Sequence, residues 1–203
     1  MSNLLASSLE KALASGQPVI TAEITPPVGA DPSHALEMAE GLRGQVQAFN
    51  VTDGSRAVMG MSSLALCRLL LERGLEPILQ LGCRDRNRIA LQADLLGAHA
   101  LGIRNVLCLT GDPVKAGNQP EARAVFDLES VRLLRQVQQL NAAIGPVGTP
   151  LADASPALIP GAAADTQSAS WNGLKSRMPR QAALGARFAD LQLVLLAPSL
   201  PIL

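Results

Sequence analysis

Short apolar runs alternate with longer amphipathic segments through the first two thirds of the chain. Four apolar runs, centred near residues 21, 50, 79 and 108, recur at a constant spacing of 29 residues and are predicted to be β-strands over 18–24, 47–52, 76–82 and 105–110. The segments after them have apolar residues at helical spacing and are predicted to be helices over about 32–42, 62–73, 88–101 and 128–140. This regular alternation indicates βα units on a parallel sheet whose strands are buried on both faces.

The pattern changes after Asn141. Residues 142–203 hold seven of the fourteen prolines, and they predict a fifth strand near 157–162 and a sixth near 188–196. The helix between those strands contains Pro179, which costs about 3 kcal/mol unless it occupies the first turn. Six strands fall short of the eight in a closed (β/α)₈ barrel, so the α/β fold is either an incomplete TIM-type barrel or an open doubly wound sheet. We treat 1–203 as one domain with a divergent C-terminal part at 142–203.

Composition excludes several classes of protein. The 203 residues are 48% hydrophobic and 17% charged, unlike a disordered chain. Seventeen basic against seventeen acidic residues, with 2% aromatics, argue against a nucleic-acid binder. Three cysteines without CxxC spacing favour neither disulfides nor a metal site, and they suit a reducing, cytoplasmic location. The start does not resemble a signal peptide, and no apolar run is long enough to span a membrane.

Polar residues collect at the carboxyl ends of the four regular strands, where parallel α/β folds hold their chemistry. These residues are Glu23, Thr25, Asn50, Thr52, Asp53, Ser55, Arg56, Gln80, Cys83, Arg84, Asp85, Arg86, Thr110, Gly111 and Asp112. Because they converge at one edge of the sheet, they predict an enzyme active site there.

Three of these features have both a functional and a structural interpretation. Glu23 lies inside an apolar run, so it is either a desolvated general acid with a raised pKa, an edge-strand side chain facing water, or half of an ion pair with an arginine. Asp112 can stabilise a cation or simply complete a turn. The run 84–88 is an anion site or, more in keeping with its composition, a helix start with many ion pairs. No GxGxxG or Walker motif is present.

Four of the strand-end motifs resemble the methylenetetrahydrofolate reductase family. They are Ala22–Pro27 (AEITPP), Asn50–Gly54 (NVTDG), Cys83–Arg88 (CRDRNR) and Leu109–Asp112 (LTGD). The resemblance is dense over 17–140 and thinner beyond, where 161–163 and 185–192 still follow the family's order. This sequence departs from the family pattern at Asp165-Thr166, at Gln181 in place of a lysine, and at Leu191, and it lacks the last two strands. The resemblance therefore implies a C-terminally shortened member.

That resemblance implies a flavin-dependent oxidoreductase of one-carbon metabolism and methionine biosynthesis. It would reduce the folate 5,10-methylenetetrahydrofolate to 5-methyltetrahydrofolate on a (β/α)₈ barrel, with NAD(P)H (NADH or NADPH) as co-substrate. Glu23 would be the general acid, Asp112 would stabilise the cationic intermediate and tune the flavin, and Gln192 would bind the pterin together with Asp112. The implied flavin is FAD, ahead of FMN, and the residues implied to line it are Thr52, Asp53, Ser55, Gln80, Thr110, Gly111 and Asp112.

Two other functions stay open on the sequence. The chain can be a non-catalytic flavin- or folate-binding remnant, or an accessory subunit, with the same fold. An unrelated barrel enzyme acting on a phosphorylated metabolite is disfavoured, because the usual phosphate site follows strands that this chain lacks. An open barrel also exposes two sheet edges, so we expect low stability as a monomer and rescue by a bound flavin or by association into a homo-oligomer.

Overall fold

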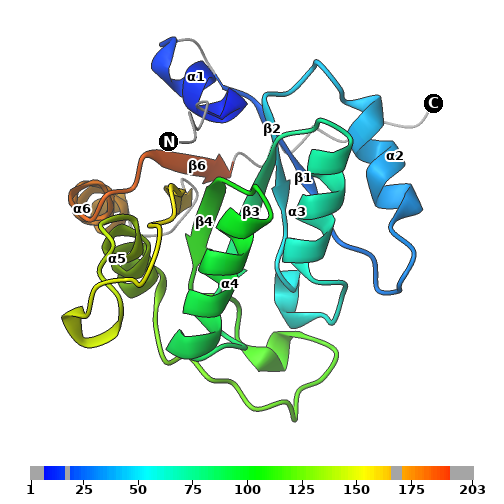
Figure 1. Ribbon diagram of the computed structural model, residues 1–203. Coiled ribbons are helices and arrows are strands. Elements are labelled where there is room, and N and C mark those ends of the chain that lie inside the picture. Colours follow the sequence, from blue (N-terminus) through cyan, green and yellow to red (C-terminus); the bar gives the residue numbers. More distant parts are fainter. Residues whose placement is uncertain (1–6, 17–18, 166–170, 193–203) are drawn as a thin grey trace.

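Six parallel strands form one sheet in the order β1-β2-β3-β4-β5-β6, which is also their order along the chain (Figure 1). The computed structural model describes residues 7–16, 19–165 and 171–192. The strands are β1 (Thr21–Ile24), β2 (Ala48–Val51), β3 (Pro77–Gly82), β4 (Asn105–Leu109), β5 (Ile159–Asp165) and β6 (Phe188–Gln192). Because each strand pairs with the next without a reversal of order, the doubly wound alternative is wrong. The fold is α/β, with six strands of a (β/α)₈ barrel curled into an open half-barrel.

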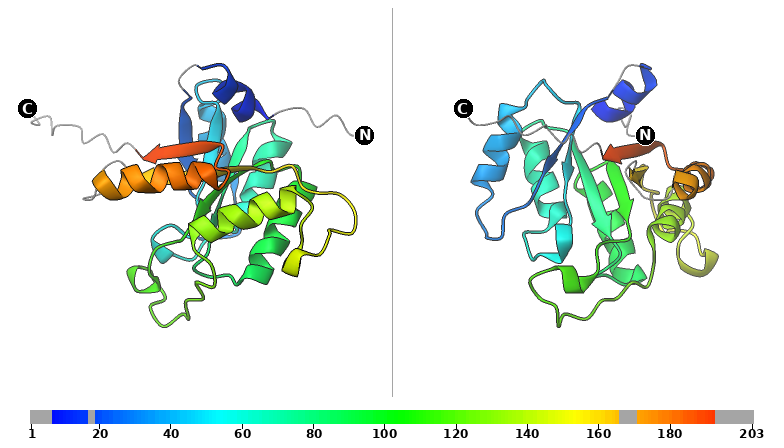
Figure 2. Two further views of the ribbon diagram at one scale, coloured as in Figure 1. Left: turned by 90° about the vertical axis from the view of Figure 1, so that its left-hand side faces the viewer. Right: turned by 180° about the vertical axis from the view of Figure 1, so that it is seen from behind.

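Helices cover the outer face of this sheet, and the opposite face of β1 to β4 carries none (Figure 2, right). The described helices are α1 (Ser8–Ala14), α2 (Ser33–Gly41), α3 (Ser63–Glu72), α4 (Arg88–Ala100), α5 (Ser130–Asn141) and α6 (Trp171–Ala183), and all of them except α1 lie on the outer face. Three short 3₁₀ helices, η1 (Ser55–Ala57), η2 (Val114–Ala116) and η3 (Pro146–Gly148), lie in the connections. The four helices predicted from the regular units are confirmed, each to within a few residues.

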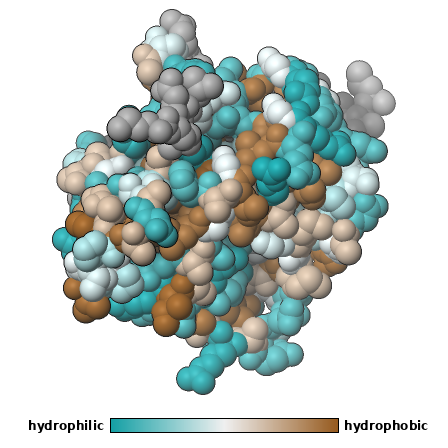
Figure 3. Space-filling view, viewed as in Figure 1, coloured by the Kyte–Doolittle hydropathy of each residue, from teal (hydrophilic) through white to brown (hydrophobic). Residues whose placement is uncertain are grey.

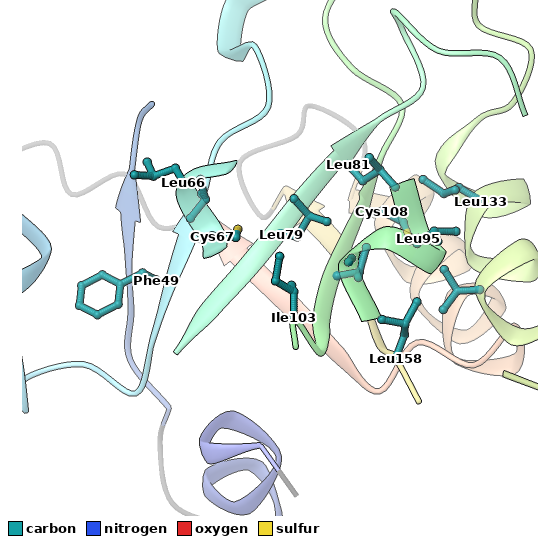
Figure 4. Packing of buried hydrophobic residues seen from close by; sticks show 14 of the residues in the cluster. Phe49, Leu66, Cys67, Leu79, Leu81, Leu95, Ile103, Cys108, Leu133 and Leu158 are labelled. Atoms are coloured by element: carbon teal, nitrogen blue, oxygen red, sulfur yellow. The ribbon is translucent and has the colours of Figure 1, made fainter. Parts of the chain in front are cut away.

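Alternation along each strand separates two environments. Phe49, Leu79 and Cys108 point to the helices and join the main core with Leu66, Leu95 and other buried residues (Figure 4). The intervening positions, such as Asn50 and Gln80, belong to the concave face, where buried polar side chains are found. One apolar face per strand therefore supplies the core, and the other is available for chemistry.

The amino-terminal helix α1 closes the concave face at the amino ends of the strands. Leu9 is 1% exposed and clusters with Ile78 and Leu107, against which Phe188 also packs. The Ser7 hydroxyl donates a 3.0 Å hydrogen bond to the Asn105 side chain. This seven-residue helix was not predicted from the sequence. The cluster forms an apolar floor beneath the polar residues.

The C-terminal part differs in detail from the prediction. The fifth strand is β5, which begins and ends two to three residues later than expected. The sixth begins at Phe188 as expected, and residues 193–196 of its predicted range lie outside the described residues. Pro179 does lie inside α6 and beyond its first turn. Gly161 of β5 is needed because a Cβ there would collide with the Phe188 ring.

The outer surface mixes hydrophilic and hydrophobic residues (Figure 3). Among the described helices, none combines the length and the apolar character that crossing a membrane requires.

Candidate functional site

A cavity of about 300 Å³ opens at the carboxyl ends of the strands, above the apolar floor. Residues from β1, β2, β3 and β4, or from the loops that follow them, meet there. All residues of these four units to which the family resemblance assigned a role line it: Glu23, Thr52, Asp53, Ser55, Gln80, Thr110, Gly111 and Asp112. Of the other polar residues at the strand ends, Arg84 lines it too, whereas Thr25, Asn50, Arg56, Cys83, Asp85 and Arg86 do not. The backbone of Gln192 ends β6 and pairs with Asp165, and its side chain lies outside the described residues.

Glu23 lies on β1 and opens into the cavity. The surrounding protein displaces water from its carboxyl group and raises its pKa, and repulsion from Asp190 of β6 raises the pKa further. No arginine forms an ion pair with Glu23 in the described part of the chain, so the ion-pair interpretation is not supported. Glu23 is also an exposed side chain on β1, an edge strand of the described sheet, so the interpretation as an edge-strand side chain facing water fits the structure as well.

Asp53, which follows β2, connects the end of that strand to β3, to α3 and, through Arg86, to α4. Its Oδ2 accepts hydrogen bonds from the Gly82 N–H (2.9 Å) and from Arg86 (2.7 Å), and its Oδ1 accepts from Arg86 (3.1 Å) and Ser63 (3.3 Å). Arg86 also pairs with Asp94 of α4 at 2.9 Å. Both Asp53 oxygens are thus occupied by protein partners, so its contribution to the cavity wall is to hold the ends of β2 and β3 in place.

The arginines of the run 84–88 are all paired with carboxylates. Arg84, only 6% exposed, binds both oxygens of Asp85 and the Gly54 carbonyl oxygen. Arg88 forms a double hydrogen bond with Asp127, which holds the pKa of that carboxyl group far below its usual range. The ion-pair interpretation of this run fits the structure, although Arg84 is buried rather than solvated.

The loop after β2 forms a strained rim. Arg56 and Ala57 have positive φ values of 53° and 57°, which cost energy for residues with side chains. The Arg56 N–H donates to the Asp112 carboxylate at 2.8 Å, and the Met59 N–H donates to Asn118 at 3.2 Å. Gly117 approaches Ala57 so closely that a Cβ would overlap its carbonyl group. These contacts hold Asp112 at the mouth.

Two buried polar atoms on β2 or at its end have no hydrogen-bond partner: the Asn50 Oδ1 and the Thr52 Oγ1. Thr52 lines the cavity and is 2% exposed. An unsatisfied buried hydroxyl costs about 1–3 kcal/mol, so its presence beside a cavity points to a ligand that bonds it. Of these two residues Thr52 lines the cavity, so a ligand with hydrogen-bonding groups could satisfy its hydroxyl.

Sequence reasoning missed several residues of the cavity. Leu107, Leu109 and Ala163 form its apolar wall, and Asp190 brings a second carboxylate beside Glu23. The signal for Asp190 was available, because it lies two residues before Gln192 and so shares its strand face. Cys83, one of the residues at the strand ends, is buried, and burial raises the pKa of its thiol to about 11. Among the described residues no His, Cys, Asp or Glu cluster can hold a metal ion.

Comparison with solved structures supports the fold. The chain is similar to 2,3-dimethylmalate lyase, a member of the PEP mutase/isocitrate lyase superfamily, with a TM-score of 0.58 and 13% sequence identity. The similarity covers 93% of this chain and 63% of that one, so this chain spans less than two thirds of its length. No curated protein matches the sequence. The methylenetetrahydrofolate reductase family model matches residues 8–198, nearly the whole chain, and the protein therefore belongs to the methylenetetrahydrofolate reductase family.

Proposed function

We propose that this protein reduces 5,10-methylenetetrahydrofolate to 5-methyltetrahydrofolate with NAD(P)H and a bound flavin. The observation that carries the proposal is the cavity itself, where the residues expected from four separate strands line one space. The overall reaction consumes the methylene compound, NAD(P)H and one proton, and it yields the methyl compound and NAD(P)⁺. A site for it must position two flat ring systems and supply that proton.

Glu23 supplies the proton. Its raised pKa keeps a fraction of the carboxyl group protonated closer to neutral pH, where an ordinary glutamate is almost fully ionised. The proton goes to the folate nitrogen that leaves as the five-membered ring opens. Ring opening leaves positive charge on the remaining nitrogen and its methylene carbon, and the Asp112 carboxylate at the rim stabilises this charge. We assign Gln192 to the pterin by resemblance to the family.

A bound flavin would supply the hydride-transfer chemistry between NAD(P)H and the folate. Thr52 and Gln80, both buried, would hold its ring system by hydrogen bonds, and Thr110 and Gly111 would border it. Gly111 has a φ of 97°, which favours glycine, and a Cβ there would approach the Arg84 side chain. We infer FAD over FMN from the family resemblance. The three cysteines are free and buried, which suits a cytoplasmic enzyme.

A second candidate is a flavin- or folate-binding protein without catalysis. Its support is the state of the basic residues: Arg84, Arg86 and Arg88 each bind a carboxylate of the protein, so they have little left for a phosphate. Gln181, at the position where the family has a phosphate-facing lysine, is buried beside Ala162 and Phe188 instead. This candidate predicts binding without turnover.

The test is an anaerobic spectroscopic titration of the full chain. FAD is added first, then NADH, then 5,10-methylenetetrahydrofolate. The proposal expects bound flavin, loss of its visible absorbance with NADH, and return of that absorbance with the folate. Bleaching without return would favour the second candidate, and failure to retain flavin would reject both flavin-based functions. Replacing FAD with FMN in the same titration tests the choice of flavin.

A further inference from the structure

The segment between β2 and α3, residues 54–61, crosses from the loop after β1 to the loop after β4, and we call it the rim segment. At one end, the Met61 N–H donates to the Pro27 carbonyl oxygen at 2.8 Å. At the other end, the Arg56 N–H donates to the Asp112 Oδ2 at 2.8 Å. Hydrogen bonds on both sides therefore hold the rim segment across the neighbouring loops.

Two consecutive residues of the rim segment have a backbone conformation that residues with side chains rarely adopt. Arg56 has a φ of 53° and Ala57 a φ of 57°. Strain of this kind persists only where surrounding contacts over-determine the backbone, and it is concentrated at functional sites. The hydrogen bond to Asp112 is one of these contacts. The turn thus keeps the Arg56 N–H in a direction that an unstrained loop would not favour.

Gly117, directly after η2, is the residue that lets the loop after β4 approach this turn. Its φ of −103° lies in the ordinary negative range, so backbone conformation does not require glycine there. A Cβ would instead overlap the carbonyl group of Ala57. Backbone atoms cannot rotate away as a side chain can, so a methyl group must displace Ala57, which adjoins Arg56. The neighbouring Asn118 accepts the Met59 N–H at 3.2 Å and keeps the two loops together.

Asp112 is exposed, and the hydrogen bond from the Arg56 N–H is what fixes its carboxylate. Among the described residues, no basic side chain forms an ion pair with Asp112, and its Oδ1 has no hydrogen-bond partner. An exposed aspartate without such a bond would sample several rotamers. Asp112 lines the cavity, so the bond to Oδ2 leaves a held carboxylate with Oδ1 available to a ligand. A charge that is already oriented stabilises developing charge better than a mobile one.

We propose that Gly117 is a positioning residue for the reaction. The absence of a side chain there lets η2 pack against η1, so that the Arg56 N–H orients the Asp112 carboxylate toward the positive charge formed when the folate ring opens. Gly117 does not line the cavity and acts only through Arg56 and Asp112. The catalytic meaning of this inference rests on the proposed function, but the orientation of Asp112 does not.

The orientation is tested by residue-resolved hydrogen exchange, measured by NMR on the full chain without flavin or folate. We expect the Arg56 amide to be protected in the wild type, and Gly117→Ala and Asp112→Ala each to raise its exchange rate about tenfold. Gly29→Ala, at an exposed glycine with open space around it, is the matched control and should leave that rate unchanged. Equal Arg56 rates in the wild type and in either Gly117→Ala or Asp112→Ala would overturn the proposal.

Asn118→Ala tests the same packing without adding an atom, and it replaces Gly117→Ala if that variant does not fold. Loss of the hydrogen bond to the Met59 N–H should loosen the rim segment and raise the Arg56 exchange rate, by less than Gly117→Ala does. In that situation, an Arg56 rate unchanged by Asn118→Ala would contradict the proposal.

In the enzyme, a double-variant comparison separates positioning from general structural support. Gly117→Ala should lower the rate of folate reduction about tenfold. Adding it to Asp112→Ala should cause no further loss, because both changes remove the same oriented charge. Losses that multiply would mean that Gly117 supports the whole site, and they would overturn the proposal. If the wild-type chain reduces no folate but the exchange results hold, the proposed function fails and the orientation of Asp112 stands.

Discussion

On the side of the cavity formed by β2 and β3, Asp53, Arg84 and Arg86 each pair with an opposite charge. Glu23 of β1 and Asp190 of β6 line the same cavity, and neither has an ion-pair partner among the described residues. In the first arrangement each charged group has a partner of opposite charge, and the pairs fix the ends of β2 and β3. In the second, the two carboxyl groups have no such partner and can bind or release a proton. Fully compensated charges serve stability, and uncompensated ones in the same cavity are available for chemistry.

The largest expected effect comes from the uncompensated side. Glu23→Gln keeps the size of the side chain but removes the transferable proton, so the rate of folate reduction should fall about 10²–10⁴-fold. Reduction of the bound flavin by NADH needs no proton from Glu23 and should change little. Stopped-flow absorbance measures the two half-reactions separately. Equal losses in both halves would mean that Glu23 acts in flavin binding rather than as the acid.

The compensated side is tested by Arg86→Ala. Removing Arg86 leaves Asp53 and Asp94 without their positively charged partner in a partly buried site. The free energy of unfolding should therefore fall by about 3 kcal/mol. Urea unfolding followed by circular dichroism measures this loss. Arg68→Ala, which breaks an exposed pair with Glu72, is the control and should cost less than about 1 kcal/mol. Similar costs for both variants would remove the distinction between the two sides.

A third variant tests how much the contact between β5 and β6, close to Asp190, contributes to stability. Gly161→Ala places a methyl group against the Phe188 ring and should destabilise the protein by about 1–3 kcal/mol. Combining it with Phe188→Leu should restore part of the loss, because the smaller side chain vacates the space. Thermal unfolding of the single and double variants measures this coupling, and strictly additive losses would contradict the contact.

The smallest effect is expected at Thr52, which directly follows β2 and lines the cavity between the paired charges and Glu23. Thr52→Val removes a buried hydroxyl without a partner, so the ligand-free protein should gain up to about 1 kcal/mol of stability. The affinity for FAD should fall about tenfold, which corresponds to about 1.4 kcal/mol. Thr149→Val, at an exposed hydroxyl already bonded to Pro146, should leave FAD affinity unchanged. Fluorescence titration gives the affinities, and an unaltered affinity in Thr52→Val would remove the hydroxyl from the flavin site.

The sequence predicted the four regular βα units because burial on both faces of a strand and on one face of a helix leaves strong periodic patterns. It could not predict α1, whose seven residues are held mainly by the tertiary contacts of Leu9 and Ser7. The start of β5 was misplaced because Pro160 and three alanines give little strand signal.

The site was predictable to a similar degree. Residues directly after strands were found from chain position alone, since all parallel strands deliver their carboxyl ends to one edge. Their partners were not, because Asp94 and Asp127 reach the arginines only through the packing of α4 and the loop before α5. The place of Asp190 two residues before Gln192 was a usable signal for its strand face, whereas its sharing one cavity with Glu23 depends on the curl of the sheet.

The apolar floor of the cavity, formed by Leu9 of α1 with Ile78 and Leu107, determines when α1 can dock during synthesis. The segment that becomes α1 is made before the strands on which it docks, because its docking surface includes Ile78 and Leu107 and its Ser7 bonds Asn105, 98 residues later. A seven-residue helix is marginal in water on its own, so Leu9 stays solvated until β4 has emerged and paired. This early segment is thus among the last to find its place, and the floor of the cavity stays incomplete until then.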